Sequence, residues 1–169
     1  MEFYAMMVAC APPHSHFVEV GSYKGRSSAF LAVEIFRSQK PILLDCVDLW
    51  DDQYEQEVGK TSNTLPDSNK LWQSWCQNVE SVKSIITPRR MSSLDGAKLY
   101  QDQSLNFVFI DADHSYQAVV ADIQAWLPKV KRGGYIAGHD YQHQPIVQAT
   151  NEILGWVSQK GGCWYRQVA

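Results

Sequence analysis

Apolar and polar residues follow one another in blocks that predict strands and helices in turn. Short segments rich in apolar residues predict strands at 17–20, 42–50, 84–87, 106–112, 135–138 and 163–168. The nearly continuous apolar run at 42–50 is typical of a parallel strand buried on both faces. Apolar residues at three- to four-residue spacing predict helices that cover a sheet, and they occur at 27–38, 68–79, 115–130 and from 145 onward. A short helix is also expected over 3–10, and another that begins with Ser92 or Ser93 as its cap.

This alternation of strand and helix predicts the fold class. We expect an α/β protein with a Rossmann-like, doubly wound, mostly parallel sheet of six to seven strands and helices on both faces. The 169 residues suit a single domain over 1–169, with a short N-terminal segment, 1–16, and a polar stretch, 51–66, as a candidate lid. Ligands of such sheets bind outside the carboxyl ends of the strands.

Composition narrows the range of partners. The net charge of −3 gives no bulk attraction to nucleic acid, and no apolar run reaches the roughly 18 residues of a membrane span. The four cysteines are scattered without a Cys-x-x-Cys pair, which favours reduced thiols over disulfides or a zinc site. We therefore expect a cytoplasmic protein that binds neither nucleic acid nor membrane.

Residues 17–27 predict a strand, a glycine turn and the start of a helix. Gly21 and Gly25 allow a sharp turn and a close approach of the backbone to a ligand. Ser27 lies where the helix begins, among N–H groups that favour an anion or a carboxylate. The turn lacks the Gly-x-Gly-x-x-Gly fingerprint of dinucleotide sites, because Tyr occupies position 23 and no third glycine follows. This pattern disfavours NAD.

Asp48 lies near the end of the second predicted strand, 42–50. A carboxylate at this position can accept hydrogen bonds from the hydroxyls of a ribose. The alternatives are a solvated loop carboxylate at Asp48, or Asp45 as the acidic group, although Asp45 falls inside the strand. Together with the glycine turn, Asp48 favours a nucleoside ligand.

Two further polar groups lie at the ends of later strands. Asp111 and His114 lie at the end of the strand 106–112, and His139 and Asp140 lie at the end of the strand 135–138. If these strands are adjacent, the carboxylates and His139 can reach one ion, and such ligands suit Mg²⁺, Mn²⁺ or Ca²⁺. His114 would lie beside that ion as a general base. The alternative is that the carboxylates cap turns and His114 caps the next helix.

These motifs resemble those of class I S-adenosylmethionine-dependent methyltransferases. Within that class the chain is similar to catechol O-methyltransferase-like small-molecule O-methyltransferases, especially the bacterial branch that includes macrolide sugar O-methyltransferases. The motifs that carry the resemblance are Glu19–Ser27, Asp48, Ser93–Ala97, Phe107–Tyr116 and Gly133–Tyr141.

The resemblance implies a role for each candidate residue. The implied metal ligands are Asp111, His139 and Asp140, and His114 takes the place of the catalytic base. Methionine would lie at Gly21, Ser22 and Tyr23 with its carboxylate at Ser27, the ribose at Asp48, and the adenine near Ser92 and Ser93. The full cofactor set implied is Glu19, Gly21, Ser22, Tyr23, Gly25, Ser27, Asp48, Leu49, Ser92, Ser93 and Asp111.

The expected activity is transfer of a methyl group from S-adenosylmethionine to a hydroxyl of a small molecule, with help from Mg²⁺ or another divalent cation. A module that binds S-adenosylmethionine without turnover, and an NAD-dependent oxidoreductase, are the alternatives. A nucleic-acid N-methyltransferase is disfavoured because the strand 106–112 ends in Asp-Ala-Asp-His rather than in a Pro-Pro-aromatic motif. A homo-oligomer is a further option, and nothing in the sequence identifies the methyl acceptor.

Overall fold

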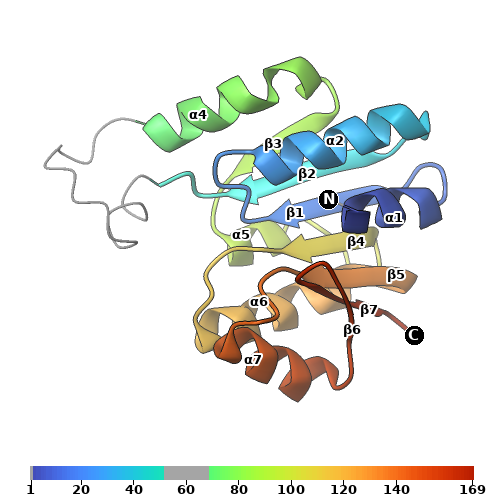
Figure 1. Cartoon of the computed structure of the whole chain (residues 1–169), viewed down its shortest axis with the longest axis vertical. Helices are drawn as coiled ribbons and strands as arrows, with labels where there is room; N and C mark the ends of the chain where they lie inside the picture. Colours follow the sequence, from blue (N-terminus) through green and yellow to red (C-terminus); the bar gives the residue numbers. More distant parts are fainter. Residues whose placement is uncertain (1, 52–68) are drawn as a thin grey trace, which may run out of the picture.

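The computed structural model describes residues 2–51 and 69–169, so the candidate lid from residue 52 onward lies outside the described residues. The described chain builds a seven-stranded sheet in the order β3-β2-β1-β4-β5-β7-β6 (Figure 1). β1 to β5 run parallel, and β7 pairs antiparallel with β5 and with β6. The strands are β1 (His16–Val20), β2 (Leu43–Asp48), β3 (Ile86–Arg90), β4 (Leu105–Ile110), β5 (Val130–Gly138), β6 (Ser158–Lys160) and β7 (Cys163–Gln167). The predicted Rossmann-like, mostly parallel sheet is confirmed.

Helices cover both faces of this sheet (Figure 1). On one face lie α1 (Glu2–Cys10), α2 (Arg26–Ser38) and α4 (Lys70–Val79). On the other face lie α5 (Ser93–Ala97), α6 (Tyr116–Trp126) and α7 (Gln144–Leu154). Two single-turn 3₁₀ helices, Glu80–Val82 and Leu127–Lys129, extend α4 and α6. No helix among the described residues is long and apolar enough to cross a membrane.

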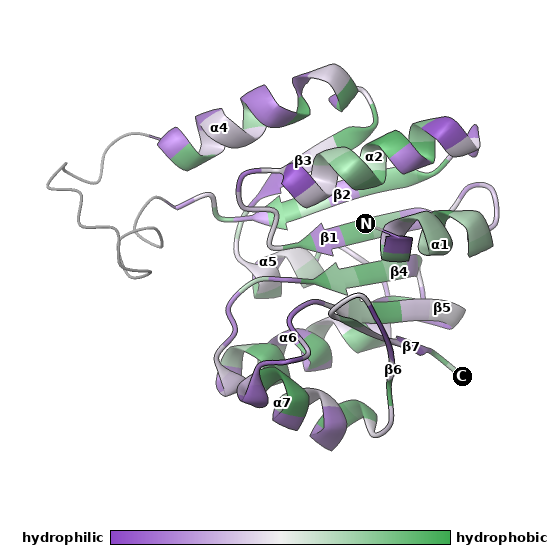
Figure 2. Cartoon of the chain, viewed as in Figure 1, coloured by the Kyte–Doolittle hydropathy of each residue, from purple (hydrophilic) through white to green (hydrophobic). Residues whose placement is uncertain are grey.

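The inner strands β1, β2 and β4 are mostly apolar because each one contributes side chains to two cores. Successive side chains of a strand point to opposite faces of the sheet. Phe107 and Phe109 of β4 therefore join the core under α1 and α2, while Val108 and Ile110 join the core under α6 and α7. Figure 2 shows β4 as mostly hydrophobic, whereas α4 mixes polar and apolar positions.

Three elements differ from the sequence-based expectation. β3 spans Ile86–Arg90, whereas this strand was expected over 84–87. β5 begins at Val130 and runs through Gly133 and Gly134, so the expected helix over 115–130 ends earlier than predicted. The pairing of β4 with β5 shifts register here, and a Cβ at Gly134 would lie 2.8 Å from the carbonyl oxygen of Asn106. The glycines thus admit an irregularity within a strand instead of forming a turn before it. β6 was not predicted, because three residues carry no detectable periodicity.

Candidate functional site

The turn after β1 is held against the ends of two other strands. Gly21 and Gly25 have φ angles of 85° and 80°, in the left-handed region that favours glycine. A carboxylate oxygen of Asp48 at the end of β2 accepts hydrogen bonds from the backbone N–H groups of Ser22 and Tyr23, both at 2.8 Å. A Cβ at Gly21 would lie 2.1 Å from the carbonyl oxygen of Asp111, after β4. The turn therefore has room for glycine only at this point.

Glu19 lies directly beneath the turn and is fully buried. Its carboxylate accepts hydrogen bonds from the hydroxyls of Tyr4 at 3.0 Å, of Ser22 at 2.9 Å and of Ser28. Burial raises the pKa of Glu19, and these hydroxyls, with that of Ser27, oppose the shift by stabilising the ionised form. Glu19 thus ties α1, the turn and α2 together from below.

A cavity of about 800 Å³ opens beside the turn, at the carboxyl ends of the parallel strands. Its lining includes most of the candidate residues predicted from the sequence, which are Gly21, Tyr23, Asp48, Leu49, Ser92, Ser93, Asp111, His114 and Asp140. The lining does not include the remaining ones, which are Glu19, Ser22, Gly25, Ser27 and His139. Gly25 is the N-cap of α2, where a Cβ would lie 2.9 Å from side-chain atoms of Trp75 and of Val79.

One wall of the cavity contains a carboxylate that was not predicted from the sequence. Asp122 of α6 lines the cavity and is buried. The Ser93 hydroxyl donates to it at 2.5 Å, and the Trp126 indole N–H donates to Ser93 at 2.9 Å. Burial raises the pKa of Asp122 to about 6, against the lowering effect of the Ser93 hydrogen bond. The available signal was an acidic residue beside Val119 and Ile123 on the apolar stripe of a helix.

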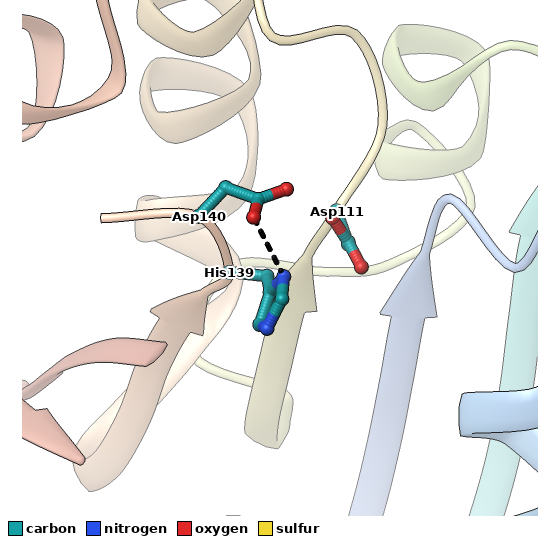
Figure 3. Close-up of side chains that lie close together, drawn as sticks. All are labelled: Asp111, His139 and Asp140. Atoms are coloured by element: carbon teal, nitrogen blue, oxygen red, sulfur yellow. Dashed lines mark ion pairs between the residues drawn. The ribbon is translucent and has the colours of Figure 1, made fainter. Parts of the chain in front are cut away.

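Asp111, His139 and Asp140 come together at another part of the cavity edge (Figure 3). Asp111 follows β4, and the other two follow the adjacent β5. One ligand atom from each of the three lies within 4.8 Å of the others, and the His139 Nδ1 lies 3.2 Å from a carboxylate oxygen of Asp140. Two carboxylates and an imidazole are a donor set that fits Mg²⁺ or Mn²⁺.

His114 lies beside this cluster. Its Nε2 is 3.4 Å from a carboxylate oxygen of Asp111 and 3.5 Å from one of Asp140. The hydrogen bond to Asp111 raises the pKa of His114, with the nearby carboxylate charges adding to it and burial opposing it. Burial also acts to raise the pKa of Asp140, but the Gln142 amide and the histidines hold that pKa below its usual value. The half-buried imidazole is thus placed to exchange a proton at the edge of the cavity.

The sheet order, the glycine turn beside the cavity and the acidic residue at the end of β2 fit a class I S-adenosylmethionine-dependent methyltransferase. A family model described as "Methyltransferase domain" matches residues 18–141, so the chain belongs to that methyltransferase family. The matched range includes every candidate site residue.

Solved structures share the fold at low sequence identity. Cofactor-bound Rv0187 from MTB superposes with a TM-score of 0.71 and 16% identity, over 99% of this chain and 78% of that one. CalS11, described as a TDP-rhamnose 3′-O-methyltransferase of calicheamicin biosynthesis, superposes with a TM-score of 0.65 and 13% identity, over 98% and 76%. At these identities the likeness shows the fold.

A curated relative matches a shorter stretch. The uncharacterized protein R132 of Acanthamoeba polyphaga mimivirus is 37% identical over 54 residues, which are 30% of this chain. That stretch covers only 24% of the viral protein.

Proposed function

We propose that this methyltransferase transfers the methyl group of S-adenosylmethionine to a hydroxyl oxygen of a small molecule, with help from a divalent cation. The observation that carries the proposal is the cluster of Asp111, His139 and Asp140, with His114 beside it, at the edge of the cavity. The description of CalS11 as a sugar O-methyltransferase supports the same reaction class.

We propose that each part of the cofactor contacts a different part of the cavity lining. The methionine part lies at Gly21 and Tyr23, and the adenine lies towards Ser92 and Ser93. Asp48 already accepts three backbone N–H groups, those of Ser22, Tyr23 and Trp50. An ionised carboxylate has about four acceptor sites, so one site of Asp48 remains for a ribose hydroxyl. Leu49 flanks this ribose position from the cavity wall.

The residues outside the lining act on the cofactor indirectly. Glu19, Ser22 and Gly25 hold the shape of the turn through the buried hydrogen bonds and the tight packing described above. Ser27, in the first turn of α2, also hydrogen-bonds to Glu19. We propose that this buried network presents the turn to the methionine carboxylate.

Methyl transfer is an in-line displacement, so the protein must orient the acceptor oxygen and remove its proton. The cation would be held by Asp111, His139 and Asp140. When bound, it would lower the pKa of a hydroxyl that coordinates to it. His114 accepts the hydroxyl proton at Nε2. The acceptor oxygen then bonds to the methyl carbon as the carbon–sulfur bond breaks, and the electron pair stays on sulfur in S-adenosylhomocysteine.

Turnover with a panel of sugar and phenol acceptors tests this proposal. Release of S-adenosylhomocysteine should require Mg²⁺ or Mn²⁺ and stop with EDTA. His114→Ala should lower kcat about 100-fold or more without weakening S-adenosylmethionine binding, because only the proton acceptor is lost. Asp140→Asn should weaken Mn²⁺ binding, measured by titration calorimetry, about tenfold or more.

His143→Ala is the matched control, because its ring lies 6.0 Å from that of His114 but it belongs to neither the cation cluster nor the cavity lining. This variant should keep its turnover. Full activity in EDTA would refute the role of the cation, and full activity of His114→Ala would refute the assigned base.

A further inference from the structure

A single buried carboxylate interrupts an otherwise apolar stretch of the cavity wall. Ala118, Ala121 and Asp122 lie at positions i, i+3 and i+4 of α6, so they share one helix face, and all three line the cavity. Other cavity-lining residues include the apolar side chains of Leu49, Met91 and Leu94. The wall therefore combines flat apolar surface with one strong hydrogen-bond acceptor.

The hydrogen bonds around Asp122 leave part of this acceptor unused. Oδ1 accepts the Ser93 hydroxyl at 2.5 Å. That hydroxyl in turn accepts the N–H of the fully buried Trp126, which fixes the serine proton towards Asp122. Within residues 2–51 and 69–169, Oδ2 accepts no hydrogen bond and Asp122 has no cationic partner.

A buried carboxylate without a cation and with a free oxygen is costly in a folded protein. Only 5% of the Asp122 surface remains exposed, and the residue lines the cavity. The free oxygen is thus available to a hydrogen-bond donor that enters the cavity.

The position of Asp122 along the cavity indicates which part of the ligand it would contact. Asp122 lies about 9 Å along the helix axis from Tyr116, at the start of α6, so the helix carries it away from His114 and the cation cluster. Asp48 takes the ribose between these two regions. The base must then lie against the α6 wall, near Ser93.

We propose that Asp122 accepts a hydrogen bond from the exocyclic amine of the cofactor's adenine and makes the cavity select adenine over bases that lack this amine. The inference rests on the proposed function only for the placement of the cofactor in this cavity. Hypoxanthine, in which a carbonyl oxygen replaces the amine, would place two acceptors against each other, and buried sites built for one donor reject such analogues strongly.

Titration calorimetry with S-adenosylhomocysteine and S-inosylhomocysteine at pH 8 tests this inference. The wild-type protein should bind the adenine compound about tenfold or more tightly. Asp122→Asn should reduce this preference to about threefold or less, because a side-chain amide can offer either its oxygen or its N–H group to the base.

Asp113→Asn is the matched control. Asp113 also lines the cavity, but its carboxylate accepts the backbone N–H of Ser115, an arrangement that Asn can keep. This variant removes one negative charge from the same cavity and should keep the wild-type preference. Thermal melts of both variants check that each is folded.

An unchanged preference in Asp122→Asn overturns the inference, as does an equal loss of preference in both variants, which would indicate a general charge effect. Wild-type protein that binds both compounds equally overturns this inference alone. Wild-type protein that binds neither compound overturns the proposed function as well.

Discussion

At the residue scale, hydrogen-bond partners distinguish the buried carboxylates. Burial raises the pKa of Asp45, yet bonds from His16 and Tyr100 and the charge of Arg89 bring that pKa below its usual value. Asp122 has the Ser93 hydroxyl alone among the described partners, and its pKa rises to about 6. The partners of Asp45 therefore stabilise the fold, whereas Asp122 keeps a free acceptor oxygen that a ligand can use.

The raised pKa of Asp122 predicts a pH-dependent stability cost. The folded protein holds this proton up to about pH 6, while the unfolded chain releases it near 3.8, so stability falls as pH rises between these values. The difference corresponds to about 3 kcal/mol at most. Asp122→Asn should match the wild type at pH 4 and exceed it by about 1–3 kcal/mol at pH 8 in urea unfolding. A variant less stable than the wild type at pH 8 would contradict this explanation.

The candidate residues that the sequence identified follow from their positions at strand ends. Asp48 and Asp111 come directly after apolar residues, Asp140 comes after His139 at the end of β5, and the carboxyl ends of parallel strands meet at one edge of the sheet. Asp122 gave no comparable signal, because a polar residue on an amphipathic helix usually faces water. Only the packing of α5 against α6 shows that it lies in the cavity.

At the element scale, the contact between the β1 turn and the end of β4 shapes the site. Strands and helices with several apolar residues were predicted well, with differences mainly at their ends. The early start of β5 and the short β6 could not be predicted, because glycine pairs usually indicate turns and β6 has only three residues. In both cases pairing with a neighbouring strand outweighs the local pattern.

Two glycines with similar φ angles allow the effect of this contact to be separated from that of backbone strain. Gly21→Ala should destabilise the protein by about 3 kcal/mol or more and abolish S-adenosylmethionine binding, because the new Cβ meets the Asp111 backbone. A Cβ at Gly133, where φ is 79°, would meet no atom within 4 Å. Gly133→Ala should therefore cost about 1–2 kcal/mol and leave binding intact. Equal effects in thermal melts and calorimetry would show that the close approach is unimportant.

At the scale of the whole molecule, strand order places the site. β1 lies between β2 and β4, so the connections that leave β1 and β4 diverge to opposite faces of the sheet and open a crevice between them. The alternation of elements predicted the parallel sheet, but this order became visible only in the structure. The identity of the acceptor depends on cavity shape, which single-sequence patterns do not encode.

The central claim is that this crevice binds S-adenosylmethionine and not a dinucleotide. Titration calorimetry of the wild-type protein with S-adenosylmethionine, and separately with NAD⁺, tests the claim directly. The structure predicts one S-adenosylmethionine bound per chain and no NAD⁺ binding, because the turn after β1 lacks the third glycine of dinucleotide sites. Absence of S-adenosylmethionine binding, or NAD⁺ binding of equal affinity, would contradict it.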